Sequence, residues 1–343
     1  NNIVDYFSLR GAMWMKDNNR SDHFIYKEHI NAAYFNISKE SKKWDMQLGF
    51  RVENTVSKGN QISMDTVFTN EYTHFFPNVS LTYHINTKND IGASYGRRIN
   101  RPNYNSLNPF ITFADSIDYV QGNPSLKAEL NNNFELTYTY KKINTTLNYS
   151  HTVDAIKEVD KQNTATKASY ITYENIKALY NIGIAINAPI MVQKWWTSNI
   201  YASLYNNHYK GFFGSDILDI SATSVSLKIN NSFTITKSLT AEITGSYDGS
   251  RSVDLRIHAP YYGIRVGVAK SILQQKGSLK FTLQSYNLNA TVNTRYGNVD
   301  NSFMLRSDNR KVILSFSYRF GKLTVPKAKE HNSATEEKSR ASG

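Results

Sequence analysis

The sequence predicts an all-β fold, an antiparallel transmembrane β-barrel of about 14 strands. Three observations favour it. Apolar residues alternate strictly with polar ones, the polar positions are rich in Asn, Thr, Ser, Gly and Gln, and the connections alternate between short and long. Strands with one side in lipid and the other in a water-filled lumen produce this pattern. A soluble sandwich usually carries Lys and Glu on its polar side.

The alternating segments follow one another along most of the chain. In the clearest pair, 134–140 and 143–149, only a Lys-Lys step separates two runs, which predicts a tight hairpin. Runs of this kind occupy, in order, 44–52, 79–85, 91–95, 134–140, 143–149, 180–186, 225–229, 239–243, 262–268, 279–283 and 312–320. A further strand is expected over residues 3–15.

The connections between these runs form two classes. Short ones are expected near 38–42, 86–90, 141–142, 188–194, 236–238 and 273–277. Long ones are expected near 54–74, 99–130, 152–168, 206–218, 249–257 and 289–302. Membrane barrels have short periplasmic turns and longer external loops. Counting back from the last strand therefore places both ends of the segment on the periplasmic side.

Composition excludes a helical membrane protein. The mean hydropathy is −0.50, and the best helical candidate, Tyr180–Val192, is interrupted by Pro189. It is also shorter than the roughly 18 residues that a membrane helix needs. The 23 Tyr, 17 Phe and 4 Trp are typical of aromatic girdles at the two membrane interfaces, for which Trp195-Trp196 and Tyr261-Tyr262 are candidates. A tyrosine-rich soluble all-β protein is the alternative.

The absence of cysteine excludes a disulfide framework, a thiolate zinc site and a cysteine nucleophile. The net charge of +12 is spread along the chain, so we expect anionic lipid headgroups or ligands, and no nucleic acid, as partners.

The chain starts at Asn1 without Met or a signal peptide, which indicates a mature chain or a fragment. The alternation stops at Gly321. We therefore expect a barrel part, residues 1–321, and a disordered polar periplasmic tail, residues 322–343.

One stretch carries a family resemblance. It reads SYGRRINRPNY over Ser94–Tyr104, LNPF over Leu107–Phe110 and GNPSLK over Gly122–Lys127. These blocks resemble the barrels of TonB-dependent receptors, above all the outer-membrane β-barrel family. Glu129 fits the acidic position of that pattern, whereas Ala128 stands where the family usually has Pro. The stretches 28–34, 48–53, 75–81 and 314–321 are also similar, so the resemblance extends from about residue 20 to residue 321.

The resemblance implies a location in the outer membrane of a Gram-negative cell and a barrel of about 22 strands. In such receptors a plug domain precedes the barrel in the chain. The plug closes the pore until the TonB complex displaces it, and the receptor then takes up a chelate, an oligosaccharide or a peptide. This chain has no plug-like segment, no TonB-contacting box and too few strands. It therefore looks like the last two-thirds of such a barrel, which closes alone or needs missing N-terminal strands.

The implied partners are outer-membrane lipid, the TonB complex through a missing plug, a nutrient ligand and a surface lipoprotein. Ferric siderophores, other metal chelates, cobalamin, oligosaccharides and peptides all remain candidate substrates.

The candidate ligand-binding residues come from the same stretch: Arg97, Arg98, Arg101, Tyr104, Asn108, Phe110 and Asn123. Arginine suits the recognition of carboxylate or phosphate at the external mouth of the lumen. In the second interpretation, the arginines pair with acidic lumen residues or the plug and hold the long loop. The steps Asn108-Pro109 and Asn123-Pro124 form turns, and the length of the loop 99–130 predicts a lid or a ligand contact. The external aromatics Tyr205, Tyr209, Phe212 and Phe213 suit stacking on sugars.

Catalytic patterns are missing from the sequence. The eight His are dispersed, and no carboxylate pair, Ser–His–Asp order or glycine-rich phosphate loop stands out. We therefore expect no catalytic residue, no metal site and no cofactor.

Three rival functions remain: a passive outer-membrane channel of about 14 strands without a plug, an outer-membrane lipase or protease, and a soluble β-sandwich binding module. An upstream plug domain would favour the receptor, and a signal peptide directly before Asn1 the channel. Solubility without detergent would favour the sandwich.

Overall fold

The computed structural model describes residues 2–11, 13–17, 21–115, 117–287, 290–307 and 309–320. The expected tail, residues 322–343, lies outside the described residues. The elements, in chain order, are β1 (Asn2–Val4), β2 (Phe7–Arg10), β3 (Met13–Lys16), β4 (Asp22–Glu40), β5 (Trp44–Gln61), the 3₁₀ helix η1 (Ile62–Met64), β6 (Thr66–Asn86), β7 (Asn89–Asn100), α1 (Tyr104–Leu107), β8 (Ile111–Phe113), β9 (Asp118–Gln121), β10 (Glu129–Tyr140), β11 (Ile143–Gln162), β12 (Ser169–Gln193), β13 (Trp196–Phe213), β14 (Asp216–Thr234), β15 (Leu239–Asp248), β16 (Arg251–Val253), β17 (Arg256–His258), β18 (Tyr261–Ile272), β19 (Gly277–Asn287), β20 (Ala290–Tyr296), β21 (Val299–Leu305) and β22 (Lys311–Tyr318).

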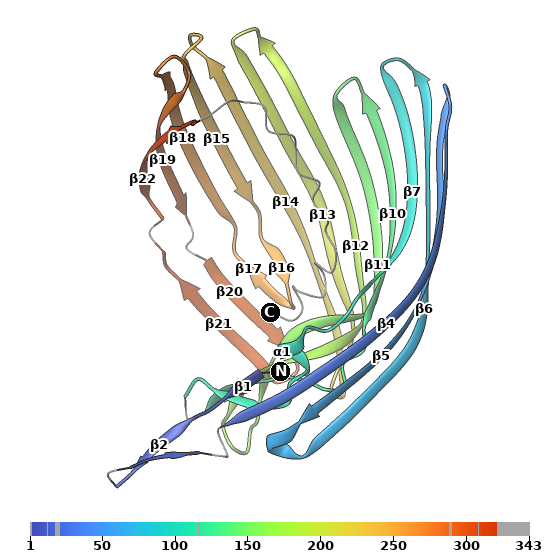
Figure 1. Ribbon diagram of the computed structural model, residues 1–343, viewed down its shortest axis with the longest axis vertical. Coiled ribbons are helices and arrows are strands. Elements are labelled where there is room, and N and C mark those ends of the chain that lie inside the picture. Colours follow the sequence, from blue (N-terminus) through green and yellow to red (C-terminus); the bar gives the residue numbers. More distant parts are fainter. Residues whose placement is uncertain are drawn as a thin grey trace.

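One large curved sheet dominates the fold. Its strands follow the order β1-β4-β5-β6-β7-β10-β11-β12-β13-β14-β15-β18-β19-β22, and neighbours along this path are antiparallel. Figure 1 shows this sheet as a deep trough, with the short turns at its upper end and the loops at its lower end. A second sheet, β16-β17-β20-β21, and the short helix α1 lie at the loop end (Figure 1). No helix in the described part of the chain is long and apolar enough to cross a membrane.

The apolar side of the strands faces outward, as the alternation predicts. Leu136 pairs with Leu147 across β10 and β11, and their exposed fractions are 43 % and 48 %. On the last strand Leu314 is 70 % exposed. The inner side carries amides, because the side chain of Asn148 donates to Asn181 and that of Asn181 donates to Asn207, both at 2.6 Å. A sandwich would bury the apolar side against a second layer. The prediction of an antiparallel barrel sheet is therefore confirmed.

The strands are longer than the sequence pattern predicts. Residues 54–74, expected as a long loop, belong almost entirely to β5 and β6, which meet across residues 62–65. The expected loops 152–168 and 206–218 shorten in the same way, to 163–168 and 214–215. A tilted strand needs only about 9–11 residues to cross a bilayer. The remainder of each strand extends the wall beyond the lipid, where apolar alternation is no longer required.

The expected strand over residues 3–15 is wrong. These residues form the three-residue β1, which pairs with the start of β4, and the separate hairpin β2-β3. The path of the large sheet therefore holds β1 and thirteen long strands among the described residues. The first long strand, β4, starts at the loop end. The expectation that both ends of the segment lie at the turn end is corrected accordingly (Figure 1).

The trough stays open along one side. Among the described residues no pairing joins β22 to β4 or β1, so both edges of the large sheet lack a partner over most of their length. Of the two expectations, closure by this chain alone and closure with further N-terminal strands, the structure favours the second, because these strands do not close a barrel by themselves. Lipid does not tolerate an unpaired sheet edge.

Candidate functional site

The loop after β7 folds inward against the inner face of β4, β5 and β6. Its apolar residues Leu107 and Leu126 are buried together with Phe24 of β4. The ring of Tyr104 lies 4.9 Å from that of Phe24, and its hydroxyl donates to the Phe24 carbonyl oxygen at 2.5 Å. The loop starts α1 at Asn103, whose side chain accepts from the backbone N–H of Ser106. Apolar burial therefore holds the loop inside the trough.

The two blocks that carry the family resemblance meet inside this loop. The backbone N–H of Gly122 donates to the Asn108 carbonyl at 2.9 Å, and that of Asn123 donates to the Ser106 carbonyl at 2.6 Å. A Cβ at Gly122 would lie 2.4 Å from the Asn108 carbonyl oxygen, so only glycine permits this approach. The side chain of Asn123 donates to the Tyr173 carbonyl at 3.0 Å and joins the loop to β12.

Asn108 fastens the loop to the opposite side. Its side-chain amide donates to the Asp22 carboxylate at 2.6 Å, and its oxygen accepts from the backbone N–H of Phe110 at 3.1 Å. The fully buried Gln61 at the end of β5 also donates to Asp22, at 2.5 Å. Both polar atoms of the Asn108 side chain have protein partners, so this side chain holds the loop in place.

Arg101 is the most deeply buried charge of the loop, with an exposed fraction of 5 %. Its Nη2 donates to Glu53 at 2.6 Å and to the Thr55 hydroxyl at 3.0 Å, and its Nε lies 3.9 Å from Glu28. Burial lowers the pKa of the guanidinium, but the hydrogen bond and charge of Glu53 outweigh it and raise the pKa above its ordinary value. Arg101 is therefore a permanent cation that ties the loop to β5.

Glu53 connects this anchor to a hollow on the inner wall. One carboxylate oxygen accepts from Arg101, and the other lies 3.2 Å from the Nε of Arg51. The guanidinium of Arg51 in turn lies over the Phe76 ring, 4.9 Å from its centre. Because one carboxylate contacts both arginines, the position of the loop and the position of Arg51 are coupled.

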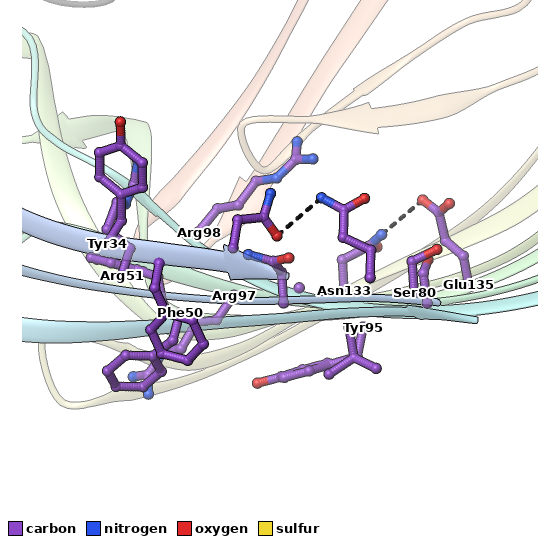
Figure 2. Close-up of a pocket in the computed structure, with 17 residues that line it drawn as sticks. Tyr34, Phe50, Arg51, Ser80, Tyr95, Arg97, Arg98, Asn133 and Glu135 are labelled. Atoms are coloured by element: carbon purple, nitrogen blue, oxygen red, sulfur yellow. Dashed lines mark hydrogen bonds between the residues drawn. The ribbon is translucent and has the colours of Figure 1, made fainter. Parts of the chain in front are cut away.

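The hollow has a volume of about 650 Å³ and is shown in Figure 2. Its lining comes from β4, β5, β6, β7 and β10. The polar lining residues lie mostly on the inner face, and Phe35, Phe50, Val79, Tyr95 and Arg97 lie on the outer face. The lining comprises Tyr34, Phe35, Asn36, Gln47, Phe50, Arg51, Phe76, Asn78, Val79, Ser80, Ser94, Tyr95, Gly96, Arg97, Arg98, Asn133 and Glu135. One amide pair and one amide–carboxylate pair are preorganised there, because Gln47 donates to Asn36 at 3.4 Å and Asn133 donates to Glu135 at 2.8 Å (Figure 2). The hollow offers cations, amides and one carboxylate to a polar ligand.

Arg97 and Arg98 lie on opposite faces of β7. Register pairs Gly96 with Asn133, so Arg98 shares the inner face with Glu135, and Arg97 shares the outer face with Tyr95. Figure 2 shows the same separation. Arg98 is exposed, and no hydrogen bond or ion pair joins its guanidinium to another described residue. Arg98 is therefore a lumenal cation available to a ligand.

The sequence prediction thus divides into two groups. Arg101 contacts Glu53 and holds the loop, as the second interpretation of the arginines expects, and Tyr104, Asn108 and Asn123 hold the loop through their own protein contacts. Phe110 is half-buried at the end of the Asn108 turn. Among the predicted residues, Arg98 lines the inner face of the hollow as an exposed cation. Sequence reasoning missed Arg51, Glu53 and Glu135. Their signal was their place at inner positions of alternating strands.

A second buried cluster lies between the loop ends of the long strands and the small sheet β16-β17-β20-β21. It joins Val159, Ile176, Tyr209, Phe213, Leu218, Leu255, Tyr296 and Val299. Tyr209 and Phe213 are therefore packed inside the protein, and the expectation that they stack on sugars is wrong. Phe213 contacts the Tyr296 ring edge-on, with the ring centres 4.8 Å apart. Phe212 is exposed, as alternation with Phe213 requires.

Arg256 of β17 locks the small sheet to β11. Its Nη1 donates to Glu158 at 2.6 Å, while its Nη2 and Nε donate to the two oxygens of Asp160 at 2.7 and 3.0 Å. The Asp160 hydrogen bonds raise the pKa of Arg256 above its ordinary value, against the effect of burial. Burial also raises the pKa of Tyr296, whose hydroxyl accepts from the Asp160 backbone N–H at 2.7 Å.

Replacing Arg256 by alanine is expected to release the small sheet from the wall. The change leaves Glu158 and Asp160 side by side without a cation and costs about 2 kcal/mol in local stability. Limited trypsin digestion measures the release of the small sheet, which should appear as faster cleavage after Arg251 of β16. Arg295→Ala is the matched control, because the Arg295–Asp300 pair in the same sheet is largely exposed and should leave cleavage unchanged. Equal rates for wild type and Arg256→Ala would contradict the lock.

No group of three or more metal-ligating side chains occurs among the residues that the structure describes. The arrangement therefore offers hydrogen bonds and charge to a ligand.

Comparison with known proteins gives a consistent picture. The model of the outer membrane protein beta-barrel family matches residues 1–318. No curated protein matches the chain. Among solved structures, the FrpB iron transporter from Neisseria meningitidis (F3-3 variant) is similar, with a TM-score of 0.61 and 13 % identity over 86 % of this chain and 46 % of that one.

Two further receptors are similar in fold. The ferric-catecholate import receptor Fiu from Escherichia coli K12 has a TM-score of 0.58 and 13 % identity over 91 % of this chain and 47 % of that one. The ferric yersiniabactin uptake receptor FyuA from Yersinia pestis has a TM-score of 0.60 and 14 % identity over 88 % and 47 %. The chain spans about half the length of the solved receptors it matches.

Proposed function

The chain belongs to the outer membrane protein β-barrel family, and on that premise we propose that it forms part of the wall of a TonB-dependent receptor that takes up an anionic metal chelate. The observation that carries this proposal is Arg98, an exposed cation without a protein partner on the inner face of the barrel wall. Arg51 lines the same hollow, and Glu53 is the one carboxylate that pairs with it in the described part of the chain. Amide side chains around them can donate to chelate oxygens.

The open trough supports a receptor with more wall than these strands provide. Both sheet edges need partners in lipid, and a barrel of about 22 strands leaves room for a plug in its lumen. The inward loop narrows the lumen from the loop end, next to the hollow. In this proposal ligand binds between loop and plug, and the TonB complex supplies the energy that moves the plug. Three solved structures of similar fold are described as an iron transporter, a ferric-catecholate import receptor and a ferric yersiniabactin uptake receptor, which favours a metal chelate over an oligosaccharide or a peptide.

Binding by the complete protein tests the proposal. Ferric citrate and a ferric catecholate serve as anionic probes, and a neutral malto-oligosaccharide as the uncharged one. We expect Arg98→Ala to weaken binding of an anionic chelate by about tenfold or more, since a hydrogen bond to a charged group contributes about 1.5–3 kcal/mol. Arg97→Ala is the matched comparison, because its side chain lies on the other face of the same strand, and it should weaken binding clearly less than Arg98→Ala.

Uptake by cells separates the receptor from a passive channel. Energised uptake of radiolabelled chelate should stop when a protonophore dissipates the gradient across the inner membrane, whereas passage through a channel continues. Selective binding of the neutral sugar, or equal effects of Arg97→Ala and Arg98→Ala, would overturn the choice of an anionic ligand. Protonophore-insensitive uptake would overturn the receptor itself.

A further inference from the structure

The short turns of the barrel share one chemical feature. They comprise residues 41–43, 87–88, 141–142, 194–195, 235–238 and 273–276. Each turn contains at least one lysine, and none contains Asp or Glu: Lys42, Lys43, Lys88, Lys141, Lys142, Lys194, Lys237 and Lys276. The connections at the other end carry both signs, for example Asp65, Asp115 and Asp254 beside Lys127 and Arg251. The turn end is thus a cationic rim, while the loop end is mixed.

The rim lysines of the first turn are not neutralised by the protein. Lys39, Lys42 and Lys43 are exposed, and no ion pair joins them to a carboxylate in the described part of the chain. By contrast, Lys280 is paired with Glu242 at 2.6 Å. Glu40 and Asp45 flank this turn without pairing with its lysines, so the lysines can bind an anionic partner outside the chain.

A groove on the outer wall lies directly beside this turn. It has a volume of about 420 Å³ and is lined by Lys39, Ser41, Trp44, Met46 and Leu81. Register places Lys39 opposite Met46, and Met46 opposite Leu81, so all three side chains share the lipid-facing side. The Trp44 ring lines the groove and contacts the Tyr83 ring, with centres 4.3 Å apart. The groove therefore has an apolar floor and a cationic mouth.

We propose that this groove, with the turn that holds Lys42 and Lys43, binds an anionic glycerophospholipid of the periplasmic leaflet. Its phosphate would lie between the lysines, and an acyl chain would follow Met46 and Leu81 along the wall. Two features favour a lipid over a periplasmic protein. The charge recurs at every short turn around the wall, and the groove opens on the side that faces the bilayer. A lysine near an anionic membrane surface contributes about 1 kcal/mol, or about fivefold in affinity. The inference rests on the membrane orientation of the strands and is independent of the transported ligand.

Fluorescence of Trp44 provides the test. The complete protein is placed in nanodiscs of phosphatidylcholine that contain a small fraction of either brominated phosphatidylglycerol or brominated phosphatidylcholine. Bromine quenches tryptophan at contact, and subtracting the signal of a Trp44→Phe variant isolates the quenching at the groove. We expect phosphatidylglycerol to occupy the groove at least about fivefold more readily than phosphatidylcholine.

Charge variants test whether the lysines cause the preference for phosphatidylglycerol. The triple variant Lys39→Gln, Lys42→Gln, Lys43→Gln should lose the preference, and the corresponding triple arginine variant should keep it. The matched control, Lys127→Gln, Lys167→Gln, Lys210→Gln, removes the same charge from the loop end and should also keep it. Equal quenching by the two lipids in the wild type would overturn the proposal. So would a preference that survives the glutamine variant, or one that is lost in the control as well.

Discussion

Replacing Arg101 by alanine is expected to detach the loop 101–128 from the inner wall. Arg101 is buried between Glu53 and Thr55, and its removal leaves the Glu53 carboxylate buried beside an empty space. Breaking a buried pair by removing one partner costs about 3–5 kcal/mol. Hydrogen exchange of the complete protein measures the effect. Amides of residues 103–126 should exchange a hundredfold or more faster, since about 1.4 kcal/mol corresponds to a factor of ten.

A double-mutant comparison tests the cause of this loss. Adding Glu53→Gln to Arg101→Ala removes the carboxylate that has lost its buried partner, so the double variant should recover part of the lost protection. Arg101→Lys should be intermediate, because an ammonium keeps the charge but not the guanidinium geometry that reaches Glu53 and Thr55 together. Additive losses in the double variant, or unchanged exchange in Arg101→Ala, would show that apolar burial around Phe24 and Leu107 holds the loop without the ion pair.

The same variant also affects the hollow. Glu53 contacts Arg51 with the carboxylate oxygen that Arg101 does not use, so loss of Arg101 leaves Arg51 as the main partner of Glu53. A ligand must then compete with Glu53 for the Arg51 guanidinium. Arg101, Glu53 and Arg51 therefore form one connected charge network that spans β5 and the start of the loop.

Alternation revealed the wall of the barrel because lipid acts on one face of each strand. It located β10, β11 and β22, whose outer residues are Leu136, Leu147 and Leu314. It failed where strands leave the lipid. In β5 the inner residues Glu53, Thr55 and Ser57 are buried under the inward loop, while outer apolar residues become rare, so the segment resembles a loop in sequence. Hydrophobic periodicity cannot detect a strand whose surroundings are polar on both sides.

The candidate site shows the same division. The arginine-rich block contributes Arg97 and Arg98 to the lining of the hollow, and the roles of its members depend on register. Arg98 faces the lumen because Gly96 pairs with Asn133, and a shift of one residue would exchange it with Arg97. Arg101 is an anchor because Glu53 lies opposite it after the chain has turned inward. Neither pairing can be read from spacing along the chain, since the partners are far apart in sequence.

Substituting arginine for Leu147 is expected to destabilise the barrel strongly. Leu147 lies on the outer face of β11, between Leu136 and Ile184 of the neighbouring strands, where lipid replaces water. A cation there costs about 2–4 kcal/mol near the bilayer midplane. The adjacent Thr146 faces the lumen and contacts the Thr137 hydroxyl at 3.2 Å, so Thr146→Arg should cost only about 1 kcal/mol. Urea unfolding of the complete protein in phospholipid vesicles gives both values. Because neighbours in a strand share depth and differ only in the side they face, a larger loss for Thr146→Arg would mean that lipid contacts the Asn, Thr and Ser side of the sheet.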